Sequence, residues 1–386
     1  MRHGTETRRA EIVFFDGGGG HRSAAVALKE VLETERGWDV RLLNLPELLD
    51  DVDVIRRLSG VRMQDVYNAM LKRGWTLGAS LLIPVAQHII RRVSRRALPI
   101  LESHWRGGNP DIVISVVPNV NRPLRESLAR ARPSVPFVTV LTDLADYPPH
   151  FWVEPEPQYF ICGTAEAIQQ VISQGHVADS VFLTSGMILH PKFYVPMNAE
   201  LASARLRMGL SSDRPTGLVL FGAEGSSEIA NIATRLVRSD IDLQLILVCG
   251  RNARLADRLR RTGWQKPVHI EGFTRDVASL MDPSDFMIGK PGPGSISEAM
   301  ARGLPVIVDS NAWTLPQERF NVEWIRMKEV GLVVKDFDDI VQAVRTLLDP
   351  EWMPRYRANV AALHNRAVFE VPAILDTILA RHRPVQ

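Results

Sequence analysis

Short apolar runs recur along the chain, and most are followed by a glycine-containing loop and then by a segment with helical periodicity. In the first half the runs fall at residues 11–15, 40–45, 111–117, 137–142 and 158–162. In the second half they fall at residues 216–221, 243–249, 268–272, 285–288 and 306–308. Continuous apolar runs that alternate with amphipathic helices are typical of parallel strands buried on both faces. The pattern therefore predicts an α/β protein.

The strand, loop and helix pattern stops in the middle of the chain and then begins again. Prolines bound residues 191–196, which we interpret as a linker. We predict two Rossmann-like domains facing a cleft, over residues 1–195 and 196–370. Residues 371–386 are expected to form a C-terminal helix that could pack back on the first domain.

Composition narrows the function classes. The chain has 386 residues, 45% of them hydrophobic, and a formal net charge of +2, so bulk electrostatics predicts no nucleic-acid partner. Its two cysteines lie in apolar runs, and no Cys/His cluster has zinc spacing, which argues against a disulfide scaffold and a metal site. No run approaches the ~20 apolar residues that span a bilayer, and the N-terminus is charged. We expect a cytoplasmic protein, soluble or peripheral.

Residues 289–300 hold a turn in which glycines and prolines alternate, directly after an apolar run. Such a turn is stiff, and its backbone can approach a ligand closely. The N–H groups of Gly294, Ser295 and Ile296 are expected to lack helical partners, which together with the helix dipole makes an anion site. Glu298, about one turn further, can accept two hydrogen bonds from a vicinal diol such as that of ribose. The stretch predicts a nucleotide pocket, and the alternative is a capped helix after a proline-rich turn.

A run of four glycines, residues 17–20, precedes His21 at the start of a predicted helix. Arg22 stands where the dinucleotide fingerprint has its third glycine, so a nicotinamide cofactor is not expected. The helix dipole would lower the pKa of the His21 imidazole and favour its neutral form, which can act as a base. The alternative is a helix-start residue bonded to a nearby carbonyl. Asp143 follows another strand, at the edge where α/β sheets place functional groups.

Residues 52–106 depart from the regular alternation. They carry ten Lys or Arg side chains against three acids, and the apolar residues 77–90, preceded by Trp75, lie between the basic clusters. Basic clusters beside apolar and aromatic residues suit a surface that docks on anionic lipid headgroups and admits an acyl tail. The alternative is a helical insertion with solvated arginines.

Gln317 and Glu318 place an amide and a carboxylate on a loop after the 306–308 run. These groups suit sugar hydroxyls, and the alternative is a polar helix start after Pro316.

Gln317 and Glu318 complete an ordered set of motifs, namely Gly-Gly-Gly-His (18–21), Thr-Asp-Leu (142–144), Gly222-x-x-Gly225, Gly272-Phe273, Lys290-x-Gly292-Pro293-Gly294, Glu298-Ala299, Gly303-Leu304-Pro305 and Gln317-Glu318-x-x-Asn321. From about residue 11 to 345 this set resembles glycosyltransferase family 28, and within it the monogalactosyl- and glucosyl-diacylglycerol synthases. More distantly, the chain is similar to the enzyme that adds N-acetylglucosamine to the lipid-linked peptidoglycan precursor.

The resemblance implies a GT-B glycosyltransferase fold, with a lipid acceptor on the first domain and a UDP-sugar on the second. For the donor it implies the following roles: Glu298 at the ribose, Gly294 and Ser295 at the phosphates, Phe273 at the uracil, Gln317 and Glu318 at the sugar, Gly222 and Gly225 at the pyrophosphate, and Lys290, Gly292 and Asn321 in the same site. For the acceptor it implies Gly18, Gly19, Gly20 and Trp152. His21 would take a proton from the acceptor hydroxyl or orient it, with Asp143 as the alternative base.

We therefore expect an inverting transferase that moves a hexose from a UDP-sugar to a lipid hydroxyl such as that of diacylglycerol. It would need neither cofactor nor metal and would work as a peripheral protein on the inner face of the membrane. The departures from the family fall mostly on the acceptor side, where Val117-Pro118 replaces His-Pro and residues 148–152 reorder a His-Pro-x-Trp element. The alternatives are a UDP-sugar 2-epimerase-like isomerase and a non-catalytic nucleotide-sugar-binding protein.

Overall fold

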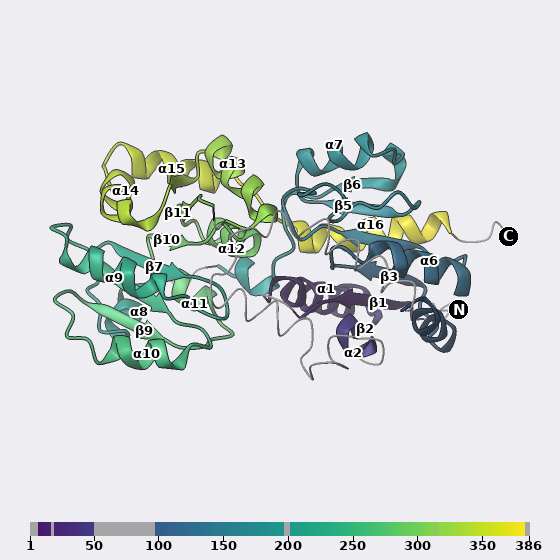
Figure 1. Cartoon of the computed structure of the whole chain (residues 1–386), viewed down its shortest axis with the longest axis horizontal. Coiled ribbons are helices and arrows are strands. Elements are labelled where there is room, and N and C mark those ends of the chain that lie inside the picture. The colour runs from purple at the N-terminus through teal and green to yellow at the C-terminus, as the bar shows by residue number, and fades with distance from the viewer. Residues whose placement is uncertain (1–6, 17–18, 50–96, 197–200, 313, 383–386) are drawn as a thin grey trace, which may run out of the picture. The chain divides into compact units, whose positions relative to one another are not determined.

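The computed structural model describes residues 7–16, 19–49, 97–196, 201–312 and 314–382. They form two compact units (Figure 1). In the described part of the chain, the first unit holds the residues up to Pro191 and those from Asn365 onward, and the second holds Lys192–His364. The division after Pro191 lies four residues before the boundary predicted from the sequence. Gly18 and residues 50–96, which include most of the segment predicted to dock on a membrane, lie outside the described residues.

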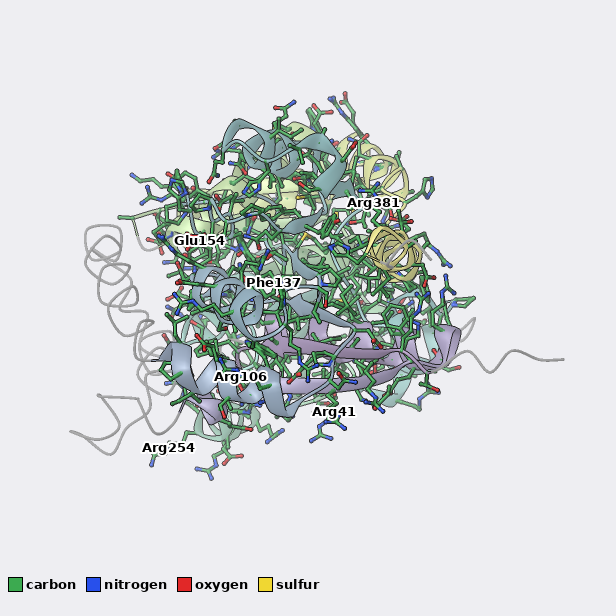
Figure 2. All side chains as sticks on the ribbon, turned by 90° about the vertical axis from the view of Figure 1, so that its right-hand side faces the viewer. Arg41, Arg106, Phe137, Glu154, Arg254 and Arg381 are labelled. Carbon is green, nitrogen blue, oxygen red and sulfur yellow. The ribbon has the colours of Figure 1, made fainter. Side chains whose placement is uncertain are left out.

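The first unit is built on a parallel sheet. Its described strands run in the order β2-β1-β3-β4-β5-β6. They are β1 (Arg9–Phe14), β2 (Asp39–Asn44), β3 (Ile112–Ser115), β4 (Phe137–Val140), β5 (Tyr159–Cys162) and β6 (Val181–Leu183). Five of the six residues of β1 and all of β3 and β4 are buried, as expected for central strands with helices on both faces. Figure 2 shows Phe137 inside this unit, with Arg41 and Arg106 at its surface.

Helices cover this sheet. They are α1 (Gly20–Arg36), α2 (Leu45–Leu48), the helix at residues 97–107, α6 (Asn121–Ala131), α7 (Ala165–Ser173), the 3₁₀ turn η2 (Ala178–Ser180) and α16 (Ala367–Arg381). The C-terminal helix α16, far from the rest in sequence, packs on α1 (Figure 1). Asp376 of α16 accepts hydrogen bonds from Arg8 at 2.5 Å and Arg36 at 3.1 Å. This return helix begins at Ala367, four residues before the predicted start.

The second unit repeats the plan. In the part that the structure describes, its parallel sheet has the order β12-β11-β10-β7-β8-β9. The strands are β7 (Thr216–Leu220), β8 (Gln244–Val248), β9 (Val268–Glu271), β10 (Phe286–Gly289), β11 (Val306–Asp309) and β12 (Gly331–Val334). Its helical segments are η3 (Pro191–Tyr194), α8 (Leu201–Arg207), α9 (Glu228–Arg238), α10 (Ala253–Arg260), α11 (Ala278–Met281), α12 (Pro293–Ala301), η4 (Pro316–Glu318), α13 (Arg319–Lys328), η5 (Phe337–Asp339), α14 (Ile340–Leu347) and α15 (Trp352–Ala361).

Each sheet contains a topological switch point, where successive strands of the chain are added on opposite sides of one central strand. In the first sheet β2 is added on one side of β1 and β3 on the other, and in the second sheet β8 and β10 flank β7 in the same way. Open α/β sheets bind ligands outside the carboxyl ends of the strands at such points. The loop before His21 follows β1, and the proline-glycine turn follows β10. The topology therefore places both predicted sites at the switch points of their sheets.

No helix in the described ranges is both long and apolar enough to cross a bilayer.

Candidate active site

In the first unit, His21 lies in the opening turn of α1, directly after the switch-point loop. Gly19, the N-terminal cap of α1, has φ +88°, a left-handed backbone that favours glycine. From this position the His21 Nδ1 atom reaches the Thr142 Oγ1 atom, 2.9 Å away, beyond the end of β4. Two of the predicted motifs, which are 121 residues apart, therefore meet at one edge of the sheet.

Burial lowers the pKa of His21 from 6.5 to about 4, and a hydrogen bond to the Val116 backbone opposes this shift only in part. The imidazole is therefore neutral at pH 7, as predicted. The main cause of its lowered pKa is desolvation, whereas the helix dipole was the cause expected from the sequence. The backbone contact also matches the alternative interpretation of a helix-start residue with a nearby carbonyl. The side chain keeps a partly exposed surface. It is thus both held in place and open to a small polar group.

Asp143 and Trp152 form a buried pair beside His21. The Trp152 indole Nε1 donates to the Asp143 Oδ2 atom at 2.8 Å, and the indole ring centroid lies 5.9 Å from that of His21. Trp152 is 0% exposed and Asp143 only 6%. The burial of Trp152 does not favour the acceptor-binding role expected for it. Its place suits a group that orients Asp143 and packs against the imidazole.

Asp146 is a residue that the sequence reasoning missed. It is 1% exposed and accepts hydrogen bonds from the backbone N–H of Trp152 at 2.6 Å and of His150 at 3.0 Å. These bonds fix the reordered 148–152 segment. The available signal was its spacing, three residues after Asp143 in the segment that follows β4.

In the second unit, α12 begins right after the proline-glycine turn, with Gly292 as its N-terminal cap. The Ile296 N–H donates to the Gly292 carbonyl at 3.1 Å, so the expectation that Ile296 is free was wrong. Helical geometry leaves the N–H groups of Gly294 and Ser295 without a partner inside the helix. A Cβ added at Gly294 would meet no described atom within 4 Å. Helix α12 thus has two N–H donors without a helical partner at its positive end.

The turn is held by two polar contacts. Lys290 Nζ donates to Glu318 Oε1 at 2.7 Å, and Asn321 Nδ2 donates to the Pro291 carbonyl at 2.8 Å. Asn321 is 0% exposed, so it supports the turn from below and does not face the surface. A Cβ at Gly292 would lie 3.5 Å from Lys290 Cε and 3.7 Å from Glu318 Oε1. Lys290, Gly292, Glu318 and Asn321 therefore form one connected cluster.

Glu298 lies one turn into α12. Burial raises the pKa of its carboxyl group from 4.5 to about 7, while the positive charge of Lys192 acts in the opposite direction. Its side chain is partly exposed, and none of the residues that the structure describes donates a hydrogen bond to the carboxylate. A partly desolvated carboxylate with unused acceptors is suited to a hydroxyl-rich ligand.

The glycine loop after β7 lies beside this turn. Gly222 and Gly225 have φ +74° and +70°. A Cβ at Gly225 would stand 2.2 Å from the Cys249 carbonyl oxygen, so the loop packs tightly on the turn that follows β8. A Cβ at Gly222 would lie 4.0 Å from Lys290 Cε. The loops after β7 and β10 are therefore neighbours at the switch point.

Two further predicted donor residues are at least partly exposed. Phe273 follows β9 and is 48% exposed, with the Arg251 guanidinium 4.7 Å from its ring centroid. Gln317 lies in η4 and is partly exposed. Among the described residues, no three His, Cys, Asp or Glu side chains are arranged to hold a metal ion.

Comparison with known proteins defines the class. Residues 21–187 match the family model of monogalactosyldiacylglycerol synthase, and residues 224–350 match that of glycosyl transferases group 1. The chain is 30% identical over 389 residues to a probable monogalactosyldiacylglycerol synthase 2 of Oryza sativa subsp. indica, covering 93% of this chain and 78% of the relative. It is 28% identical to a probable monogalactosyldiacylglycerol synthase of Glycine max, covering 90% of this chain and 66% of the relative. The chain is therefore shorter than these two plant proteins.

Solved structures agree on the fold. The glycosyltransferase SnogD of Streptomyces nogalater matches with a TM-score of 0.59 at 18% identity, covering 97% of this chain and 100% of that one. MurG of Acinetobacter baumannii matches with a TM-score of 0.61 at 14% identity, covering 96% and 99%. The two parallel sheets thus have the GT-B fold of glycosyltransferases, which confirms the predicted fold class. The chain belongs to the monogalactosyldiacylglycerol synthase family, as the motifs predicted.

Proposed function

We propose that this protein transfers a hexose from a UDP-sugar to a lipid hydroxyl such as that of diacylglycerol, with inversion at the anomeric carbon. One observation carries the proposal. The free N–H groups of Gly294 and Ser295 and the carboxylate of Glu298 lie one helical turn apart at the switch point of the second sheet. Donors for a phosphate followed by an acceptor for a diol match the order of groups in a nucleoside diphosphate. Family membership supports the transferase class.

On the donor side, each group has a separate task. Gly294 and Ser295 would bind the diphosphate, with the loop of Gly222 and Gly225 along its other side. Glu298 would hold the ribose. Gln317 and Glu318 would face the sugar hydroxyls, with Glu318 kept in position by Lys290.

On the acceptor side, His21 fits the role of general base better than Asp143. His21 is neutral at pH 7 and partly exposed, whereas Asp143 is nearly buried and accepts the Trp152 indole N–H. A base must be unprotonated and within reach of the hydroxyl whose proton it takes. Trp152 would then orient Asp143 and pack against the imidazole of His21.

The reaction is a single displacement. An oxygen lone pair of the acceptor hydroxyl forms the new bond to the anomeric carbon as the bond between that carbon and UDP breaks. The bonding electrons leave with the diphosphate, and the hydroxyl proton passes to His21. The helix N-terminus and free N–H groups of α12 stabilise the charge that grows on the leaving diphosphate.

A donor screen tests the proposal. The purified full chain is incubated with UDP-galactose, UDP-glucose or UDP-N-acetylglucosamine and a membrane lipid extract, and released UDP and glycolipid are measured by mass spectrometry. We expect one donor to give equal amounts of UDP and glycolipid. Interconversion of the UDP-sugar without lipid would instead identify an epimerase. Binding of UDP-sugar without turnover under all conditions would leave only a binding protein.

We also propose that residues 52–106 bring the protein to an anionic membrane surface on the cytoplasmic side. The support is the excess of ten basic side chains over three acids in that segment. Sedimentation with vesicles checks it, because binding should need an anionic lipid and weaken as salt rises. Equal binding to neutral vesicles would argue against the charge-based account.

A further inference from the structure

Arg251, a residue without a role in the site as predicted, connects three loops at the carboxyl edge of the second sheet. It follows β8. Its guanidinium lies 4.7 Å from the ring centroid of Phe273, which follows β9. Its Nη1 atom donates to Glu224 Oε1 at 2.9 Å, in the glycine loop after β7, and its backbone N–H donates to the Ala223 carbonyl at 2.8 Å.

These contacts fix the plane of the guanidinium. The ring of Phe273 lies on one side, and the carboxylate of Glu224 holds one edge. The Arg251 side chain nevertheless remains 54% exposed, whereas Glu224 is only 17% exposed. A guanidinium is planar, always charged and weakly hydrated, and such planes stack on nucleobases. An oriented and exposed planar cation beside the proposed phosphate-binding loop is therefore suited to stacking on a nucleobase.

We propose that Arg251 is the platform on which the base of the nucleotide donor stacks, with Phe273 behind it and Glu224 setting its orientation. The proposal rests on the nucleotide site described above and adds a base-binding residue to it. Because the Arg251–Glu224 pair is neutral overall, the platform acts through its flat face and contributes little net charge to the phosphates.

The arrangement also ties the base to the diphosphate. The segment of Ala223 and Gly225 packs on Cys249 and Arg251 through backbone contacts, and a Cβ at Gly225 would stand 2.2 Å from the Cys249 oxygen. A base on Arg251 would therefore have a fixed position relative to the loop beside the phosphates. A site whose two binding groups are already fixed relative to each other loses less entropy when the ligand binds.

Calorimetric titration of the full chain tests this inference with two probes, UDP and inorganic pyrophosphate, which lacks a base. We expect Arg251→Ala to weaken UDP binding about ten-fold, a loss typical of base stacking, and to leave pyrophosphate binding unchanged. Arg251→Lys should lose nearly as much, because an ammonium keeps the charge but has no planar face. The matched control is Arg254→Ala, an exposed arginine three residues away, which should bind both probes like the wild type.

Four outcomes would overturn the platform. Tighter UDP binding by Arg251→Ala would mean that Arg251 covers Phe273 and must move aside. Wild-type affinity in Arg251→Lys, or weaker pyrophosphate binding in either variant, would mean that Arg251 acts through charge. Equal UDP affinity of wild type and Arg251→Ala would remove it from the site altogether. A wild-type protein that does not bind UDP would instead refute the nucleotide site itself, so the two failures are distinguishable.

Discussion

Lys290 and Glu318 form an ion pair of 2.7 Å between the turn after β10 and the segment η4. Glu318 is 6% exposed, whereas the Lys290 side chain is 36% exposed. A carboxylate at this depth depends on its partner, because an unpaired buried charge is costly. The pair thus links the turn proposed to bind the phosphates to the segment proposed to bind the sugar.

Lys290→Met should lower the free energy of unfolding by about 1–3 kcal/mol, less than for a fully buried pair because Lys290 is partly exposed. Urea unfolding measures the change. The double variant Lys290→Met/Glu318→Gln should recover most of the loss, since it removes the stranded charge. A single variant as stable as the wild type would show that the pair does not hold the turn.

Gly294→Ala should separate folding from binding. No described atom lies within 4 Å of the added methyl group, so the variant should unfold at or slightly above the wild-type temperature. The methyl group would stand where the backbone approaches a phosphate, so UDP binding should weaken ten-fold or more. Gly263→Ala, at another open position, is the control and should change neither property. Unchanged UDP affinity in Gly294→Ala would place the phosphates elsewhere.

His21→Ala should reduce turnover by about 10²–10⁴-fold, the usual contribution of a general base. Its affinity for UDP should be unchanged, because His21 serves the acceptor. Steady-state turnover and UDP titration on the same preparation measure the two effects. A variant with wild-type turnover would remove His21 from the chemistry.

The stability of the protein should depend on the ionisation of Glu298. Its pKa is about 7 in the folded state against an ordinary value of 4.5, so between these pH values the folded chain holds a proton that the unfolded chain has lost. The contribution is therefore present at low pH and is lost as pH rises through 7, by up to about 3 kcal/mol.

Glu298→Gln stays neutral at every pH, so relative to the wild type it should gain stability between pH 5 and pH 8. Urea unfolding at both values measures this gain. Glu323→Gln, on the exposed face of α13, provides the control. The same difference between wild type and Glu298→Gln at both pH values would contradict the burial of this carboxyl group.

The sequence predicted the central strands well because they are continuous apolar runs. It missed β6 and β12, each of which lies at one edge of its sheet in the described part of the chain. Both are short and only partly buried, and Leu183 of β6 is 57% exposed. Edge strands of this kind lack the uniform apolar run that marks a buried strand.

The glycine motifs reveal backbone geometry, so the sequence indicated the outline of the candidate site, and the roles of its residues stay predictions. The meeting of His21 with Thr142 follows from strands whose carboxyl ends share one edge. The motifs could not show which of the predicted site residues are buried in the folded protein. Asn321 and Trp152 are fully buried supports, an outcome that depends on packing between segments distant in sequence. The pairing of the Ile296 N–H with the Gly292 carbonyl is local and depends on where α12 begins.

Calorimetric titration of UDP into the full chain and into Glu298→Ala tests the central claim most directly. The account predicts that the wild type binds UDP with one site and that Glu298→Ala binds at least ten-fold more weakly, because the ribose diol loses its carboxylate acceptor. Equal affinity of the two proteins for UDP would contradict it.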